Sequence, residues 1–345
     1  MKHTMHMADA LISPTVGATM WTASAAMIAY CSTKVRGERD ERKVPLMGVL
    51  GAFLFAAQMI NFTIPATGSS GHIGGGLLLA ILLGPHAAFL IIASVLVVQA
   101  LFFADGGLLA LGCNIFNLGF FPAFVAYPLI HRVIAGANPG RLRLSLATII
   151  AAVAGLQMGA MGVVLETVSS GISSLPFSTF VSLMLPIHLA IGLVEGFVTA
   201  AVVAFVASAR PDIVQNAFPA RPLAQPSLRP LLLAFLVAAV VTGGVVSWFA
   251  SSQPDGLEWS IARVTGQEEL SAPAAGLHGR LAALQEKIAL LPGYAFSGQD
   301  ESTAAAIQRD ERIGTSLSGI VGGLATLSLV AGIALLLKRR SLPAK

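Results

Sequence analysis

Apolar residues occur in long unbroken stretches along this chain, and short polar segments separate them. Most stretches hold about 20 residues, the length that an α-helix needs to cross a lipid bilayer. Within a few residues, they fall at 14–32, 44–64, 74–83, 86–103, 107–130, 144–168, 177–207, 230–250 and 317–337. The stretch 74–83 is too short to cross unaided. We expect it to form a half-helix packed inside the protein, where broken membrane helices are tolerated.

The composition agrees with a membrane protein built from helices. Hydrophobic residues make up 55% of the 345 residues, charged residues make up 11%, and the mean hydropathy is +0.78. Soluble domains carry about 25% charged residues, and the apolar stretches are too long for barrel strands. The predicted fold is therefore all-α and polytopic, with membrane lipid around it. It consists of a core of about seven helices followed by two C-terminal transmembrane helices.

Basic residues cluster in segments that a simple alternation of crossings would place on one side. Most of the 21 Lys and Arg residues lie in 34–43, 132–143, 210–229 and 338–345. If every apolar stretch crosses, the short one included, these segments share a side, and the positive-inside rule makes that side cytoplasmic. We expect a multi-pass protein of the bacterial cytoplasmic membrane, with the N-terminus and 251–316 outside and the C-terminus cytoplasmic. The same bias accounts for the net charge of +4, so no nucleic-acid partner is expected.

The chain changes character near residue 209, where prolines become frequent. Such a segment is typical of a linker, here on the cytoplasmic side. The polar segment 251–316 follows it, and within that segment Leu277–Leu291 has the apolar repeat of a helix. Pro254-Asp255-Gly256-Leu257-Glu258 is interpreted as a turn followed by an acidic residue. The predicted parts are a membrane domain 1–208, a linker 209–229 and a two-helix domain 230–345.

Two histidines stand out because the predicted topology brings them to one side. His6 lies in the polar N-terminal segment and His72 in a loop rich in Gly and Ser, with two apolar stretches between them. Two crossings return the chain to the side on which it began, so both imidazoles face outward. Taken alone, each is most simply an ordinary terminal or loop histidine. Together they predict a site for a divalent transition metal.

Other features leave two further interpretations open. Glu195 follows His188 by two helical turns, so both side chains could lie on one helix face and act as acid–base groups in a membrane-embedded enzyme. Alternatively, the protein could be a membrane scaffold that recruits partners through 251–316 and transports no metal. The sequence contains no G-x-x-x-x-G-K-[ST] motif, so any ATP-driven transport would need a separate ATPase.

Several motifs occur in an order that is typical of one family. They are Met5-His6-Met7-Ala8-Asp9, then Thr67-Gly68-Ser69-Ser70-Gly71-His72-Ile73-Gly74-Gly75-Gly76, and later His188-Leu189-Ala190-Ile191-Gly192-Leu193-Val194-Glu195-Gly196. Over roughly 5–208 the chain resembles the metal-capturing membrane subunit of nickel and cobalt energy-coupling factor transporters, the NikM/CbiM family. After residue 228, with its Pro-Asp-Gly-Leu-Glu run, it resembles the small companion subunit NikN/CbiN. The chain therefore looks like a fusion of the two.

This resemblance implies a transporter subunit and not an enzyme. It would be the substrate-binding component of an ATP-driven importer, with separate ATPase subunits and a transmembrane coupling (T) subunit as partners. Ni(II) or Co(II) would be the transported substrate, and no catalytic cofactor is expected. The metal ligands that the family implies are the amine of Met5, the backbone nitrogen and imidazole of His6, and the imidazole of His72. Such a near-planar set of four nitrogens suits Ni(II). On proximity alone, we expect three neighbouring residues to support these ligands: Ser69, Ser70 and Gln58.

The chain departs from the family at its start. Met1-Lys2-His3-Thr4 precedes Met5, so Met5 has no free amine unless translation begins there. We expect translation to begin at Met5, because Met5-His6 fits the family's register. Met1-Lys2-His3 has the spacing to wrap one Ni(II) or Cu(II) by itself, but it does not fit that register. Nickel and cobalt both stay open, since both metals accept imidazole and amine nitrogens.

Overall fold

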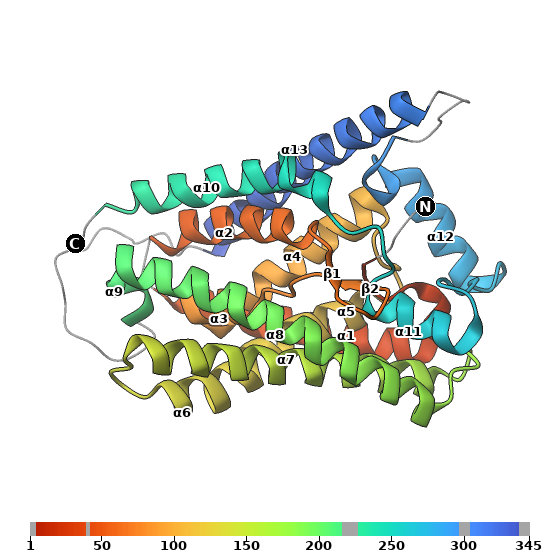
Figure 1. The fold of residues 1–345 in the computed structure, drawn as a ribbon, viewed down its shortest axis with the longest axis horizontal. Coiled ribbons are helices and arrows are strands. Elements are labelled where there is room, and N and C mark those ends of the chain that lie inside the picture. Colours follow the sequence, from red (N-terminus) through yellow and green to blue (C-terminus); the bar gives the residue numbers. More distant parts are fainter. Residues whose placement is uncertain (1–4, 39–41, 216–226, 297–303, 338–345) are drawn as a thin grey trace, which may run out of the picture.

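Most helices run side by side along the long axis of the computed structural model (Figure 1). The structure describes residues 5–38, 42–215, 227–296 and 304–337. The strands in those residues form one antiparallel hairpin, β1 (Phe62–Ile64) and β2 (Ser69–Gly71), in which Phe62 lies opposite Gly71. The predicted all-α, polytopic fold is confirmed.

Each apolar stretch of the first domain forms a helix. After a 3₁₀ turn, Asp9–Leu11, come α1 (Pro14–Gly37), α2 (Lys43–Gln58), α3 (Gly76–Leu83), α4 (Pro85–Phe103), α7 (Arg141–Ser170), α8 (Phe177–Ala209) and the short α9 (Pro211–Gln215). Between α4 and α7 runs one helix composed of α5 (Leu111–Ile115), a π-helical segment (Phe116–His131) and α6 (Arg132–Ala135). Pro122 and Pro128 lie inside the π-helical segment and lack the N–H that a regular helix uses.

The helix α3 is the half-helix that its short apolar stretch predicts. All its residues are buried, so the irregular backbone before it lies within protein, where such backbone is tolerated. Lys43 at the start of α2 donates a hydrogen bond from Nζ to the carbonyl oxygen of Leu83 (3.3 Å). The chain therefore returns at the end of α3 to the end of the bundle where α2 began. The hairpin β1–β2 and α3 together bring the chain from one end of the bundle back to the other.

The second domain packs two helices against α2. It contains α10 (Arg229–Gly244), a 3₁₀ turn (Val246–Phe249), α11 (Gly256–Thr265), α12 (Gly276–Ile288), a second 3₁₀ turn (Pro292–Tyr294) and α13 (Ala304–Leu337). A Cβ atom at Gly319 of α13 would lie 2.4 Å from the carbonyl oxygen of Gly243 of α10, and one at Gly322 would lie 2.0 Å from the ring of Phe55. Glycine thus permits these helices to approach closely, as is common between membrane helices.

Three boundaries differ from the predicted ones. The stretch 44–64 is helical only to Gln58, because the residues after it leave the helix for the hairpin. The stretch 230–250 ends its helix at Gly244, and α13 begins at Ala304, inside the predicted outward segment 251–316. The repeat predicted at 277–291 is α12. The helix α11 begins at Gly256, inside the Pro-Asp-Gly-Leu-Glu run, whereas the predicted structure there was a turn followed by an acidic residue.

The two ends of the bundle differ in content. One end holds α9, the α6–α7 connection and the basic residues Arg42, Arg143 and Arg210. The other holds the N-terminal segment, the hairpin, α11 and α12 (Figure 1). The predicted alternation of crossings is therefore reproduced. The assignment of the basic end to the cytoplasm stays a prediction.

Long apolar helices with exposed apolar faces indicate a lipid environment. Among the described residues, five helices are long and apolar enough to cross a membrane: Pro85–Phe103, Leu111–Ala135, Arg141–Ser170, Phe177–Ala209 and Arg312–Leu337. Leu146, Phe197 and Val237, on α7, α8 and α10, are 47%, 62% and 53% exposed. Large apolar patches of this kind are rare on soluble monomers, and a bilayer would cover them.

Candidate metal site

The N-terminal segment is threaded into the end of the bundle. Met5, His6 and Met7 are buried. Met7 donates its N–H to Oδ1 of Asn114 (3.1 Å), and Asn114 returns a hydrogen bond from Nδ2 to the carbonyl oxygen of Met7 (3.1 Å). Oδ1 of Asp9 accepts the N–H groups of Leu109 and Ala110, which stand directly before α5. These bonds hold the first described residues in one position.

A chain of amides fixes the ring of His6. The carbonyl oxygen of Gly74 can only accept, so Gln58 donates to it from Nε2 (2.9 Å) and turns Oε1 toward Gln99. Gln99 therefore donates from Nε2 to Gln58 (3.0 Å) and presents Oε1 to Nε2 of His6 (2.9 Å). The network assigns the proton of His6 to Nε2. Its other nitrogen, Nδ1, keeps a lone pair that a metal ion can use.

His72 lies beside His6, as the sequence predicts. The ring centroids are 5.3 Å apart and the rings meet edge to face. In the described part of the chain, the buried Nδ1 atom of His72 has no hydrogen-bond partner. Burial lowers the pKa of His72 to about 3, helped by the nearby imidazoles of His6 and His188. His72 is thus held neutral, which is the form of imidazole that binds metals.

Asp105 links the main chain of Met5 to the second domain. Its Oδ1 accepts the N–H of Met5 (2.7 Å), and its Oδ2 accepts the hydroxyl of Tyr294 (2.6 Å) and lies 3.9 Å from Nε2 of His6. The ring of Tyr294 stacks on Phe103, with centroids 4.8 Å apart. Burial and the carboxylate of Asp105 raise the pKa of Tyr294 well above its ordinary value, so the hydroxyl stays a donor.

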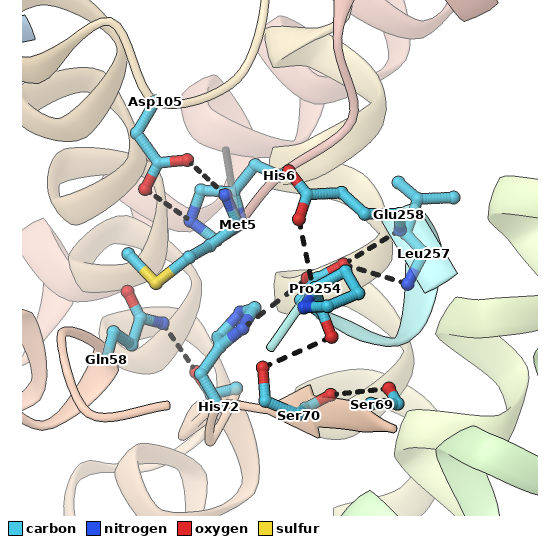
Figure 2. A network of polar contacts seen from close by, with 12 residues as sticks. Met5, His6, Gln58, Ser69, Ser70, His72, Asp105, Pro254, Leu257 and Glu258 are labelled. Carbon is cyan, nitrogen blue, oxygen red and sulfur yellow. Dashed lines mark hydrogen bonds and ion pairs between the residues drawn. The ribbon is translucent and has the colours of Figure 1, made fainter. Parts of the chain in front are cut away.

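The Pro-Asp-Gly-Leu-Glu run lies directly over the hairpin (Figure 2). Ser70 donates its N–H to the carbonyl oxygen of Pro254 (2.8 Å) and its hydroxyl to that of Gln253 (2.7 Å). Ser69 donates its hydroxyl to the carbonyl oxygen of Ser70 (3.0 Å). Of the three residues predicted to support the metal ligands, Gln58 contacts His6 indirectly, through Gln99. Ser70 belongs to the contact between the hairpin and the second domain, and Ser69 forms its hydrogen bonds within the hairpin.

Asp255 forms the N-cap of α11. Its Oδ1 accepts the N–H groups of Leu257 (2.8 Å) and Glu258 (3.1 Å), and Glu258 accepts the N–H of Asp255 in return, which completes a capping box. Its Oδ2 lies 3.8 Å from Nδ1 of His72, too far for a hydrogen bond. Burial, and then Glu258, raise the pKa of Asp255 well above its ordinary value.

The imidazoles line a cavity of about 90 Å³. Met5, His6, His72 and Asp255 form part of its wall, and it continues between α7 and α8. Among the described residues, no three His, Cys, Asp or Glu side chains are close enough to hold a metal ion by themselves. A metal bound here would therefore need main-chain nitrogen in addition to the two imidazoles. That requirement matches the ligand set expected for Met5 and His6.

His188 and Glu195 also border this cavity, but each is engaged with the backbone. Glu195 accepts the N–H groups of Gly74 (3.1 Å) and Gly75 (2.8 Å), directly before α3. A carboxylate at this position stabilises the free N–H groups and the positive dipole end of a helix. His188 is hydrogen-bonded through Nδ1 to the carbonyl oxygen of Met184 (2.8 Å). These hydrogen bonds make Glu195 a structural support of the loop that carries His72 and tie His188 to its own helix, α8.

The fold and this cavity define a polytopic helical membrane protein with a nitrogen-rich site at one end. Residues 6–213 match the CbiM family, described as the cobalt uptake substrate-specific transmembrane region, and residues 229–339 match the PDGLE domain. The chain belongs to the CbiM family, and a PDGLE domain follows the family region. The predicted resemblance is confirmed.

Relatives share this two-part organisation. A putative fused nickel transport protein NikMN of Archaeoglobus fulgidus is 33% identical over 336 residues, which cover 94% of this chain and 96% of the relative. A fused nickel transport protein NikMN of Rhodobacter capsulatus is 31% identical over 356 aligned residues, covering 96% of each chain. A solved structure described as that of a transition metal transporter has a TM-score of 0.54 and 30% identity, and the match covers 61% of this chain and 97% of the other. These similarities support a metal transporter and not an enzyme.

Sequence reasoning missed the contribution of the second domain to this site. Asp105, Gln99 and Asn114 lie in or beside apolar stretches, where polar residues predict interior hydrogen bonds. Tyr294 gave no signal, since it lies in a polar segment about 190 residues from its partner Asp105. Asp255 belongs to a noticeable motif, but a capping box predicts only the start of a helix.

Proposed function

We propose that this chain is the substrate-binding component of an ATP-driven energy-coupling factor transporter that imports Ni(II) or Co(II). The metal is captured on the outer face by the main-chain nitrogens of Met5 and His6 and by the imidazoles of His6 and His72. The observation that carries the proposal is the meeting of the two imidazoles, 5.3 Å apart, with a lone pair on Nδ1 of His6 and an unpartnered Nδ1 on His72.

The donor set agrees with the proposed substrates. Four nitrogens in a near-planar array suit Ni(II), and imidazole and amine nitrogens also suit Co(II). The nickel and cobalt transport named for the relatives supports the same choice. His6 also has the support that metal-binding histidines usually have, a hydrogen bond from its other ring nitrogen, Nε2, that fixes the orientation of the ring.

Energy for uptake comes from other subunits in this proposal. The sequence holds no P-loop, so separate ATPase subunits act through a transmembrane coupling subunit. The protein is oriented with the N-terminal segment, α11 and α12 outside and the basic end in the cytoplasm. The second domain covers the outer end of the metal-binding domain, where it assists capture.

Metal binding to purified protein with a verified N-terminus tests the proposal. In equilibrium dialysis, His6→Ala and His72→Ala each lower the affinity for Ni(II) and Co(II) by more than about 100-fold, beyond the 10- to 100-fold typical of supporting groups. His86→Ala is the matched control, because His86 lies at the opposite end of the bundle beside Tyr30. If His72→Ala binds nickel like the parent, the proposed site is wrong.

The start of the chain is tested separately. N-terminal sequencing of the protein expressed from its native gene should find Met5 as the first residue, because a free amine there completes the donor set. Acetylation of that amine, or a tag placed before Met5, should weaken metal binding. An intact Met1-Lys2-His3 terminus on a transport-competent protein would contradict this part of the proposal.

A further inference from the structure

We propose that Asp255 of the second domain is an additional, oxygen-donating ligand of the captured metal. In this arrangement the PDGLE domain completes the metal site in addition to covering it. The inference rests on the proposed function, since it concerns the same site. The inference goes beyond the proposed function because it adds a carboxylate from a different domain to metal ligands that are otherwise all nitrogens.

The two atoms that would share the metal already face each other. Oδ2 of Asp255 lies 3.8 Å from Nδ1 of His72. Metal–nitrogen and metal–oxygen bonds of about 2.0–2.2 Å place two ligands of one ion about 2.9 Å apart at a right angle and about 4.2 Å apart in a line. The observed separation falls inside this range. An ion placed between these two atoms can therefore contact both.

Neither atom has another use in the described part of the chain. Nδ1 of His72 is buried and lacks a hydrogen-bond partner. Oδ1 of Asp255 caps α11 by accepting two N–H groups, which leaves Oδ2 as the oxygen directed at His72. A buried polar atom without a partner is costly, and a buried carboxylate gains most from a cation. A divalent ion between the two atoms satisfies both.

The rest of the motif holds the carboxylate in this position. Pro254 accepts hydrogen bonds from Ser70, two residues before His72. Gly256 packs against α8 so closely that a Cβ atom there would lie 2.9 Å from Ile191 and 3.0 Å from His188. Glu258 closes the capping box. Each of these contacts fixes the first turn of α11, and with it the direction of the Asp255 side chain.

The carboxylate also changes what the site can select. A planar set of four nitrogens favours Ni(II) and Cu(II), whereas an added oxygen ligand raises the coordination number and suits ions that prefer more than four ligands. A net negative charge on the ligand set further favours a divalent cation over a monovalent one. We therefore expect Asp255 to contribute more to Co(II) binding than to Cu(II) binding.

The test compares Asp255→Asn with Glu258→Gln in the full-length protein. Asn caps a helix as well as Asp does, so Asp255→Asn removes the charged ligand oxygen and keeps α11. Glu258→Gln removes one charge next to Asp255 but keeps the capping box, because Gln at this position can accept the same N–H of Asp255. We expect Asp255→Asn to weaken Co(II) and Ni(II) binding 10- to 100-fold and Glu258→Gln to change it less than about twofold. His72→Ala is measured in parallel as the control for the proposed function.

A second measurement separates a ligand from a support. At saturating Co(II), the visible absorption of the bound ion reports its coordination number and donor atoms. It should differ between Asp255→Asn and the parent, and agree between Glu258→Gln and the parent. Unchanged affinity and spectrum in Asp255→Asn would overturn the inference, as would equal losses in both variants. In either case the loss of binding in His72→Ala would leave the proposed function standing. Parent-like binding in His72→Ala would instead remove the proposed function, and this inference with it.

Discussion

The hydroxyl of Tyr294 offers a direct test of how the second domain supports the metal site. It donates a 2.6 Å hydrogen bond to Oδ2 of Asp105, whose Oδ1 holds the N–H of Met5. Tyr294→Phe removes this bond but keeps the ring that stacks on Phe103. The perturbation therefore isolates one hydrogen bond between the two domains.

The expected magnitude follows from the kind of bond. A hydrogen bond to a charged group contributes about 1.5–3 kcal/mol, and its loss leaves a buried carboxylate oxygen unsatisfied. We expect the free energy of unfolding to fall by about 2 kcal/mol, which lowers Tm by about 4 °C in a chain of this size. Because Asp105 then holds Met5 less firmly, the affinity for Ni(II) should fall about tenfold.

Two assays on the detergent-purified protein measure these effects. Thermal unfolding without metal gives the change in Tm, and equilibrium dialysis gives the affinity for Ni(II). Tyr30→Phe is the matched control, because Tyr30 is 46% exposed and lies at the far end of α1. A lower Tm with unchanged affinity would show that Tyr294 joins the domains without positioning Met5. No change in either measurement would refute the reasoning altogether.

Three further predictions concern the second domain and the topology. Gly256→Val should displace α11 and weaken nickel binding, since a Cβ atom at this position would lie 2.9 Å from Ile191 and 3.0 Å from His188. Equilibrium dialysis measures the affinity, and parent-like affinity would contradict the close packing. Both native cysteines are buried, so a newly introduced cysteine can be labelled selectively. A cysteine at Ser252 should react with a membrane-impermeant reagent from outside, and one at Asn138 should react only from the cytoplasm. The reverse pattern would overturn the proposed orientation. Deleting 228–345 should leave a folded first domain but sharply reduce uptake in cells that supply the ATPase and its membrane partner. Restoring that region as a separate chain should recover part of the uptake, and uptake unaffected by the deletion would refute its role.

The apolar pattern of the sequence predicts the membrane helices, their order and the shared side of the two histidines. Length and hydropathy are local properties, and a helix in lipid must satisfy its backbone internally, so the apolar stretches predict the crossings closely. Counting those crossings was enough to bring His6 and His72 to one side. Even the buried half-helix α3 was visible in the shortness of its stretch.

The side chains that surround those histidines could be identified only from the folded structure. The series of hydrogen bonds from Gly74 through Gln58 and Gln99 to His6 joins several separate elements. No spacing along the sequence encodes this series. Asp255 and Tyr294 reach the site from another domain, over separations of more than 180 residues. Hydrogen bonds and buried charges depend on distances of a few ångströms between segments that packing brings together, whereas hydrophobic patterning constrains only the face or side on which a residue lies. The second domain's part in the metal site therefore became visible only in three dimensions.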